Sequence, residues 1–249
     1  MKAYLDLVRD IYVLAVILVA SYWDLKKREI EPVYWLYVSA ISVLLSFLEL
    51  QVEGTTLSYL YVYMVLSGIA IALLGTLYMV GYMGGADLYA LVFITLSIPV
   101  PLFASSLIPV PLLTVLYSAL SSIAVPFYFC FHNLTYNYGV LRRSRYKRKL
   151  VLCFLGTPQR IGDYIRGKGF WFPLTVPGEE ESVRYTFDIE EEPEEHRAKL
   201  KSMVDKGLVN ENDYVWVTIG LPYVAFILVG YVLSIIIGDY PFTLLFGGS

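Results

Sequence analysis

Six long apolar runs constrain the fold of this 249-residue chain more than any other feature of its sequence. They occupy residues 5–23, 33–50, 59–80, 88–103, 107–131 and 215–237. A helix needs about 20 mostly apolar residues to cross the hydrocarbon layer of a membrane, so each run is a candidate span. The composition agrees, because 57% of the residues are hydrophobic and only 16% are charged, whereas an ordinary soluble domain has about 25% charged residues. The sequence therefore predicts an all-α polytopic membrane protein with six transmembrane helices.

Prolines mark the least regular part of this pattern, between the fourth and fifth runs. Pro99, Pro101, Pro109 and Pro111 all lie there. Proline lacks the N–H that a helix interior needs and clashes with the preceding turn. We expect the chain to reverse tightly at the membrane surface between residues 99 and 111.

A polar segment of about eighty residues separates the fifth and sixth runs. It begins with a basic run at 142–149, becomes acidic and rich in Gly and Pro, and ends in a helical pattern from Pro193 to Lys206. Pro193, Glu194 and Glu195 suit a first helical turn, and Gly207 suits a C-terminal cap. We therefore expect three parts: transmembrane helices in 1–131, a soluble segment in 132–213, and a last helix with its tail in 214–249.

The positions of the lysines and arginines predict the orientation of the spans. Alternating six spans places every basic residue except Lys2 and Arg9 on one side. Basic residues close to span ends stay in the cytoplasm. The sequence predicts a multi-pass protein of the cell membrane, with the 132–213 segment in the cytoplasm and both termini outside.

Two aspartates are candidate catalytic residues because of where they fall in this topology. Asp24 ends the first span, and Asp87 begins the fourth, both on the predicted cytoplasmic side. A carboxylate at the membrane boundary is costly and suggests a function. Two neighbouring carboxylates can share one proton, so that the charged one activates water and the neutral one donates a hydrogen bond to a peptide carbonyl. This route to peptide hydrolysis needs no metal and no cofactor, and we expect neither.

The glycines before Asp87 are candidate substrate-binding residues. Residues without a bulky side chain allow another chain to approach the backbone closely. A peptide bond is accessible to hydrolysis only where the substrate is extended. We expect an extended substrate strand to lie against Gly84, Gly85 and Ala86.

Simpler interpretations of each feature remain open. Asp24 can be a solvated charge beside Lys26, Lys27 and Arg28, which are typical determinants of topology. Asp87 can be a helix cap after a glycine turn. Two other classes of protein also fit: a proton-coupled transporter that uses Asp24 and Asp87 as a relay, and a membrane scaffold whose cytoplasmic segment binds partners.

The residues around the two aspartates resemble those of archaeal preflagellin peptidases and type IV prepilin peptidases, which are GxGD membrane aspartyl proteases. The resemblance rests on DLKKREI at 24–30, on GGAD at 84–87, and on VWVTIGLP at 215–222. Ala86 replaces the second glycine of GxGD, which is a small change. By resemblance, Asp24 and Asp87 are the catalytic pair.

The resemblance also implies a substrate and a reaction. The substrate would be an archaellin or type IV pilin-like precursor, with a short basic leader followed by an apolar helix. An aspartic endopeptidase would remove the leader at the cytoplasmic face of the membrane. The partners expected are this precursor and the lipid bilayer, with no nucleic acid.

Overall fold

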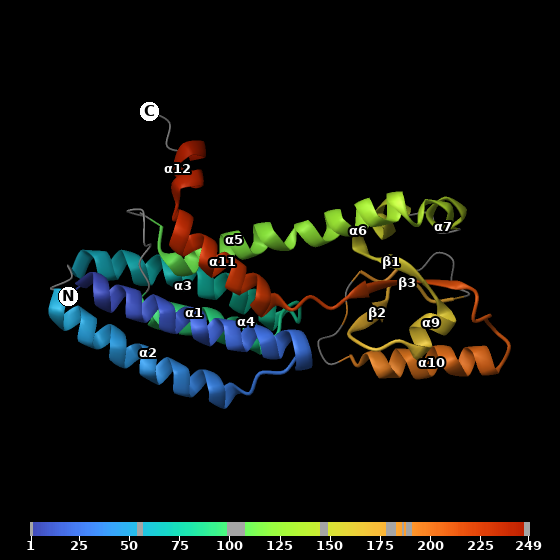
Figure 1. The fold of residues 1–249 in the computed structure, drawn as a ribbon, viewed down its shortest axis with the longest axis horizontal. Helices are drawn as coiled ribbons and strands as arrows, with labels where there is room; N and C mark the ends of the chain where they lie inside the picture. The colour runs from blue at the N-terminus through green and yellow to red at the C-terminus, as the bar shows by residue number, and fades with distance from the viewer. Residues whose placement is uncertain are drawn as a thin grey trace. The chain divides into compact units, whose positions relative to one another are not determined.

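The computed structural model of the chain describes residues 2–53, 57–98, 108–144, 149–177, 183–185, 187 and 191–246. The chain divides into two compact units, which we call the helical unit and the sheet unit. The helical unit comprises Met1–Ser122 and Pro222–Ser249, and the sheet unit comprises Ile123–Leu221. Each unit is described by itself (Figure 1).

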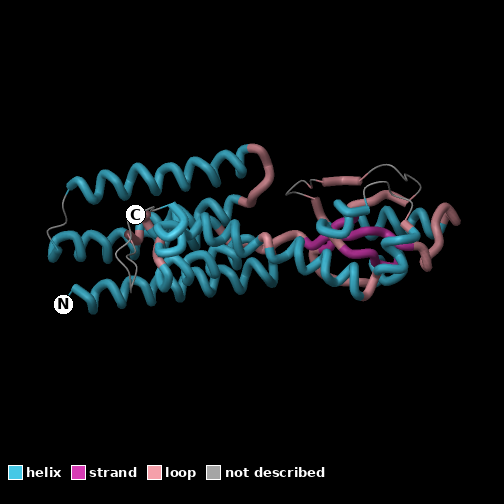
Figure 2. The backbone as a smooth tube through the Cα atoms, turned by 90° about the horizontal axis from the view of Figure 1, so that it is seen from above, coloured by secondary structure: helices cyan, strands magenta, loops and turns pink. Residues whose placement is uncertain are grey.

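Long helices form the helical unit and lie side by side (Figure 2). They are α1 (Lys2–Lys27), α2 (Pro32–Glu53), α3 (Leu57–Met79), α4 (Gly85–Leu96), α5 (Val110–Ser122), α11 (Tyr223–Ile237) and the short α12 (Tyr240–Phe246). The first three predicted runs are helical, as expected. Of the reversal predicted for 99–111, residues 99–107 lie outside the described part, and α5 begins at Val110.

Two helical stretches in the described part of the chain are long and apolar enough to cross a membrane by length and composition: Leu60–Met79 and Val110–Thr135. The apolar helices Pro32–Leu48, Gly85–Leu96 and Tyr223–Ile237 are shorter. In the first turns of α1, Arg9 is buried and pairs with Asp6 at 3.1 Å and Asp10 at 3.4 Å. The chain is thus mostly helical, with two candidate membrane spans.

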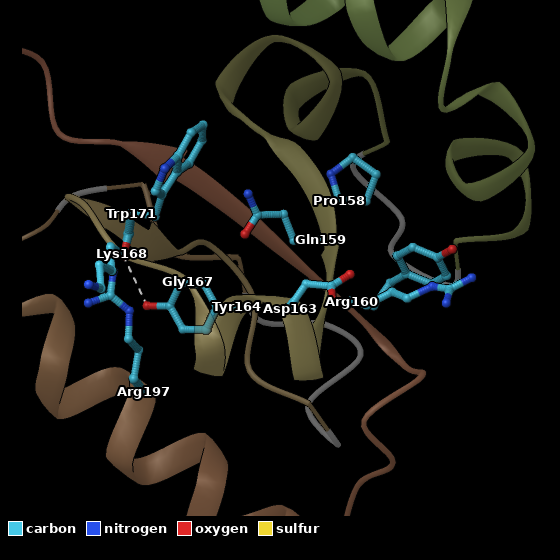
Figure 3. Close-up of a pocket in the computed structure, with 10 residues that line it drawn as sticks. Pro158, Gln159, Arg160, Asp163, Tyr164, Gly167, Lys168, Trp171 and Arg197 are labelled. Atoms are coloured by element: carbon cyan, nitrogen blue, oxygen red, sulfur yellow. Dashed lines mark hydrogen bonds between the residues drawn. The ribbon is translucent and has the colours of Figure 1, made fainter.

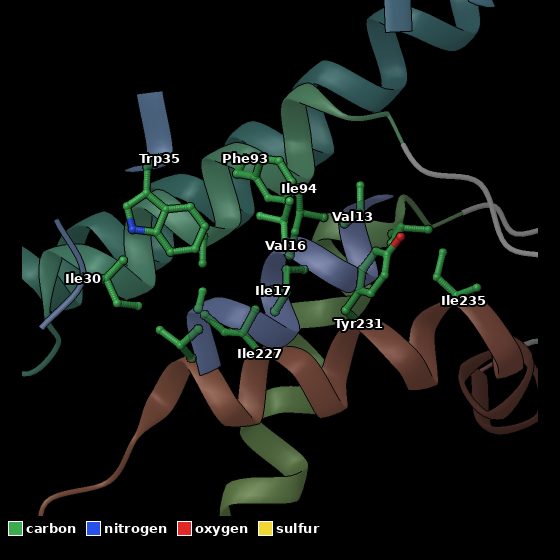
Figure 4. Close-up of a cluster of buried hydrophobic side chains, with 14 residues drawn as sticks. Val13, Val16, Ile17, Ile30, Trp35, Phe93, Ile94, Ile227, Tyr231 and Ile235 are labelled. Carbon is green, nitrogen blue, oxygen red and sulfur yellow. The ribbon is translucent and has the colours of Figure 1, made fainter. Parts of the chain in front are cut away.

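The core of the helical unit forms where α1, α4 and α11 meet (Figure 4). Its buried members include Val13 and Ile17 of α1, Phe93 of α4, and Ile227 and Tyr231 of α11. In α1 and α11 these side chains recur at four-residue spacing, which is a spacing of one helical face. The core fixes the end of α1 beside the beginnings of α4 and α11.

A glycine allows α11 and α5 to pack with their backbones in close contact. A Cβ at Gly230 would overlap the Thr114 carbonyl oxygen and the Ser118 hydroxyl, and would lie 2.8 Å from the Ser118 nitrogen. Close to this contact, the hydroxyls of Thr114 and Ser234 are hydrogen-bonded at 3.2 Å. Such close approach of small residues is a common way for apolar helices to associate.

The sheet unit contains a three-stranded antiparallel sheet in the order β1-β3-β2. Its elements are α6 (Ala124–Thr135), α7 (Tyr138–Arg143), α8 (Lys149–Leu155), β1 (Thr157–Arg160), α9 (Ile161–Arg166), β2 (Trp171–Pro173), α10 (Pro193–Asp205) and β3 (Tyr214–Ile219). Figure 1 shows the sheet between α6 and α10. The helix predicted from Pro193 is confirmed, and Gly207 ends it in the left-handed conformation with φ +68°.

The sheet corrects two predictions from the sequence. The chain is not all-α, and the last apolar run is not one helix from 215, because 214–219 form the central strand. Val215, Val217 and Ile219 are β-branched, and Tyr214 and Trp216 are aromatic, which are the residue types that strands favour. Gly220 and Pro222 then separate this strand from α11.

The fifth predicted run, 107–131, is also divided. It is α5 followed by α6, with Ile123 between them. Pro126 lies in the first turn of α6, where a missing N–H has no intrahelical partner to lose. Pro126 therefore accounts for the start of a second helix within a run whose apolar pattern predicted a single helix.

Candidate active site

Asp24 lies in the last turn of α1 and is 8% exposed. Its Oδ2 accepts a hydrogen bond of 3.2 Å from the backbone N–H of Val224, in the first turn of α11. The first N–H groups of a helix have no partner within the helix and carry partial positive charge, so they stabilise a carboxylate. The beginning of α11 thus favours a charged Asp24.

Asp87 lies in the first turn of α4 and is 7% exposed. Its Oδ2 accepts the N–H of Gly84, the N-cap residue, at 3.1 Å. This bond is the reciprocal half of a capping box, in which the third helical residue bonds back to the cap. The simpler interpretation, that Asp87 is the helix cap, is therefore wrong in position: Gly84 is the cap, and Asp87 is the third helical residue that bonds back to it.

The charge of Asp24 affects the pKa of Asp87. Both lie just beyond the ends of the predicted spans 5–23 and 88–103. Burial raises the pKa of Asp87, and the negative charge of Asp24 raises it further, while the Gly84 N–H and Arg28 lower it. Burial also raises the pKa of Asp24, but Arg28 and the Val224 N–H oppose this. The surroundings favour one shared proton, held by Asp87.

Arg28 is a further member of this site. From the sequence it was expected only to help to determine the membrane topology. It is half-buried, and its guanidinium interacts electrostatically with both Asp24 and Asp87. Its backbone is left-handed, with φ +59°, and its N–H donates to the Asp24 carbonyl at 3.1 Å. The sequence did not mark Arg28, because its place beside the aspartates depends on this left-handed turn after α1 ends at Lys27. Lys26 and Lys27 are exposed.

Tyr223 is a second residue near the pair that the sequence did not single out. It begins α11 and is half-buried, and its phenol is close enough to Asp87 to interact with the charge of that residue. Its ring lies 6.2 Å from that of Phe226. No pattern in the sequence marked Tyr223, because its position depends on where α11 begins after the strand.

Three small residues precede Asp87, and the chain's own packing does not require Gly84 and Gly85 to lack a Cβ. Gly84 has φ −75°, which any residue adopts, and a Cβ on Gly84 or Gly85 would make only ordinary contacts at 3.6 Å or more. Gly81, with φ +80°, is the glycine that ends α3. Gly84, Gly85 and Ala86 are half-buried, with the rings of Tyr78 and Tyr89 beside Gly85 and with Ala86 packed against the core.

Within the described residues, neither a candidate metal cluster nor the pocket of the sheet unit includes Asp24 or Asp87. The described residues contain no group of three or more His, Cys, Asp or Glu placed to hold a metal ion. A pocket of about 430 Å³ lies within the sheet unit (Figure 3). Its lining includes Arg160, Lys168 and Trp171, and it contains neither Asp24 nor Asp87.

Comparison with known families agrees with the resemblance in the sequence. Residues 11–127 match the type IV leader peptidase family, and residues 148–240 match the family described as archaeal peptidase A24 C-terminus, type II. The chain belongs to the type IV leader peptidase family. The first match contains both aspartates, and the second contains β3 and α11, whose first turn bonds Asp24.

A curated relative supports the archaeal branch of the leader peptidase family. The chain is 27% identical to the preflagellin peptidase of Methanococcus voltae over 235 residues, which cover 90% of this chain and 92% of the relative. The two chains thus correspond over nearly their whole length. The family predicted from the short motifs around Asp24 and Asp87 is confirmed.

Proposed function

We propose that the chain is a membrane-embedded aspartic endopeptidase, with Asp24 and Asp87 as its catalytic pair. It removes the short basic leader from archaellin or type IV pilin-like precursors at the cytoplasmic membrane face. The observation that carries this proposal is the pair itself: two buried carboxylates, 63 positions apart in sequence, whose charges interact. A buried pair of this kind outside a metal site is the arrangement that proton sharing requires.

The surroundings of each carboxylate suggest its role in the reaction. The Val224 N–H and the Arg28 cation both favour the ionised form of Asp24, which takes a proton from water. Asp87 is protonated and donates a hydrogen bond to the scissile carbonyl. Water oxygen bonds to the carbonyl carbon while Asp87 gives its proton to the carbonyl oxygen. Asp24 then protonates the leaving nitrogen, the C–N bond breaks, and Asp87 recovers its proton from the collapsing intermediate.

The substrate proposal rests on the small residues before Asp87 and on the curated relative. A Cβ at Gly84 would meet only the Asp87 carboxylate within 4 Å, so an extended strand at Gly84, Gly85 and Ala86 would lie beside that carboxylate. The relative is named a preflagellin peptidase, so a precursor with a cytoplasmic leader and an apolar helix is the natural candidate. In such a precursor the helix stays in lipid and the bond to be cut lies at the level of the two aspartates.

The topology that we propose is the one predicted from the basic residues. Six spans place both termini outside and the 132–213 segment in the cytoplasm. Large apolar side chains are exposed along the helices of the helical unit, including Leu36 at 69% and Met79 at 86%. Exposed apolar surface of this extent marks contact with a membrane or a partner.

A reconstituted system tests peptidase against transporter. The full chain is placed in proteoliposomes together with an archaellin-like precursor, with a pH-sensitive dye inside the vesicles. We expect the leader to be released at a single site, identified by mass spectrometry, without proton flux. Proton flux that depends on Asp24 and Asp87, without any cleavage of the precursor, would establish the transporter instead.

The dependence of cleavage on pH will report on Arg28. Activity should fall at acid pH as Asp24 is protonated and at alkaline pH as Asp87 is ionised. Because the Arg28 cation lowers the pKa of both carboxyls, Arg28→Gln should move both limbs of the profile to higher pH. The variant should be several-fold less active than the wild type on the acid side and relatively more active on the alkaline side.

A matched substitution separates this effect from a structural one. Lys27→Gln removes a neighbouring, exposed cation and should leave the pH profile in place. If Arg28→Gln lowers the rate equally at every pH, Arg28 supports the fold and does not set the charge of the pair. That outcome would leave the peptidase proposal untouched.

A further inference from the structure

The sheet unit has an apolar face where its sequence predicted a soluble segment. Helix α8 buries Leu152 and Cys153 against the unit, yet it directs Leu150, which is 78% exposed, and Phe154 outward. On an ordinary soluble unit the outward face of a surface helix is polar. The outer face of α8 therefore has the character of a surface that contacts something apolar.

Side chains of α6 extend this face into one patch. Phe127, Phe131 and Leu134 are spaced by four and three residues, share one side of α6, and are each more than half exposed. The rings of Phe127 and Phe154 meet edge to face, with centroids 5.8 Å apart, and so join the two helices. We call Phe127, Phe131, Leu134, Leu150, Val151 and Phe154 the α6–α8 patch.

The attachment of α8 to α6 is specific. The buried side-chain amide of Asn133 donates to the carbonyl oxygens of Cys153 at 3.0 Å and Gly156 at 2.6 Å. These are carbonyls at the C-terminal end of α8, which lack partners within the helix. Next to them, the Cys130 and Cys153 sulfurs lie 3.4 Å apart. The patch is thus a fixed surface rather than the chance exposure of a loose helix.

Two observations bear on what covers the patch. The α6 side of the patch belongs to the stretch Val110–Thr135, which is long and apolar enough to cross a membrane. Arg142 and Arg143 lie exposed at the end of α7, and Lys149 begins α8, with its ammonium group donating to the Arg142 carbonyl at 2.7 Å. Cations beside an apolar helix face match the headgroups and acyl boundary of an anionic membrane.

We propose that α8 lies in the interface of an anionic membrane, with the α6–α8 patch in the acyl boundary and Arg142, Arg143 and Lys149 at the headgroups. The sheet unit would then be held at the membrane surface by its own contacts, in addition to its chain connections. This assignment is independent of the peptidase chemistry, because none of these residues belongs to the aspartate site.

Spin labels on the full chain in lipid nanodiscs test the assignment. Leu150→Cys and Leu208→Cys are each made in a variant that carries Cys130→Ser and Cys153→Ser and still melts cooperatively. Leu208 is a matched control, since it is 67% exposed on the same unit but follows α10, which lies across the sheet from α6 (Figure 1). In nanodiscs containing phosphatidylglycerol, the label at 150 should be several-fold more accessible to oxygen than to a water-soluble nickel complex, and the label at 208 the reverse.

Removing the cations tests the role of charge. Arg142→Gln with Arg143→Gln should raise the nickel accessibility at 150 several-fold in anionic nanodiscs, and the label at 208 should not respond. If the label at 150 is as accessible to nickel as the one at 208, α8 is in water or against a protein, and the proposal fails. It fails equally if the double substitution leaves position 150 unchanged.

Discussion

Replacing either Asp24 or Asp87 with asparagine is expected to lower the rate of leader cleavage by at least about 10³-fold, within the range that a general acid or base contributes. Asparagine keeps an oxygen that can accept the Val224 or the Gly84 N–H, so the local hydrogen bonds survive. What is lost is the capacity to exchange a proton. The double variant should be no worse than either single one, because the two groups act as a unit.

The control for these variants is an exposed aspartate of the sheet unit, which does not contain the pair. Asp205, the last residue of α10, meets this description, and Asp205→Asn should cut the precursor at the wild-type rate. Rates are measured on an archaellin-like precursor in the same membrane preparation, and melting temperatures verify that each variant is folded. Normal cleavage by either Asp24→Asn or Asp87→Asn would rule out the catalytic pair.

Replacing Gly230 with alanine adds a single methyl group and is expected to lower the stability of the folded chain strongly. A Cβ there would overlap the Thr114 carbonyl oxygen and approach the Ser118 nitrogen, which are backbone atoms of α5 and cannot rotate away. Overpacking of this kind costs about 2 kcal/mol. For a chain of this size, Gly230→Ala should therefore lower the melting temperature in detergent by about 5 °C or more.

Another helical glycine provides the comparison. Gly75 lies in α3, and a Cβ there meets nothing within 4 Å, so Gly75→Ala should be neutral or should raise the melting temperature slightly. If Gly230→Ala melts no lower than Gly75→Ala, α5 and α11 do not pack as closely as described. Activity is not the measure here, because a displaced α11 would also move the Val224 N–H away from Asp24.

The sequence predicted the helices of the helical unit because their signals are local. Length and apolar content identify α1, α2 and α3, and the Pro193 start and Gly207 stop identify α10. The strand at 214–219 was missed because a short apolar run is equally compatible with a strand and with the first turns of a helix. What decides between them is the pairing of Val215 with Gln159 and of Thr218 with Phe172, and that information lies in distant parts of the chain.

For the candidate site, the sequence could supply the charged residues but not their partners. Asp24 and Asp87 stood out because a carboxylate at a span end is unusual. Arg28 stood among basic residues with an ordinary role in topology, and the left-handed turn that places it beside the aspartates has no signal in the sequence. The hydrogen bond from the Val224 N–H to Asp24 could not be predicted from the sequence. Nearly every residue has a backbone N–H, and this one is available to Asp24 only because α11 begins at Tyr223.

This last contact has a consequence for adaptation of the enzyme. An amide hydrogen is supplied by every residue type except proline, so substitutions at position 224 can alter packing while the donor to Asp24 persists. The guanidinium at position 28, in contrast, disappears with a single codon change. In homologous chains that work in more acidic or more alkaline cytoplasm, we expect position 28 to differ. The backbone donor at the start of α11 should stay the same.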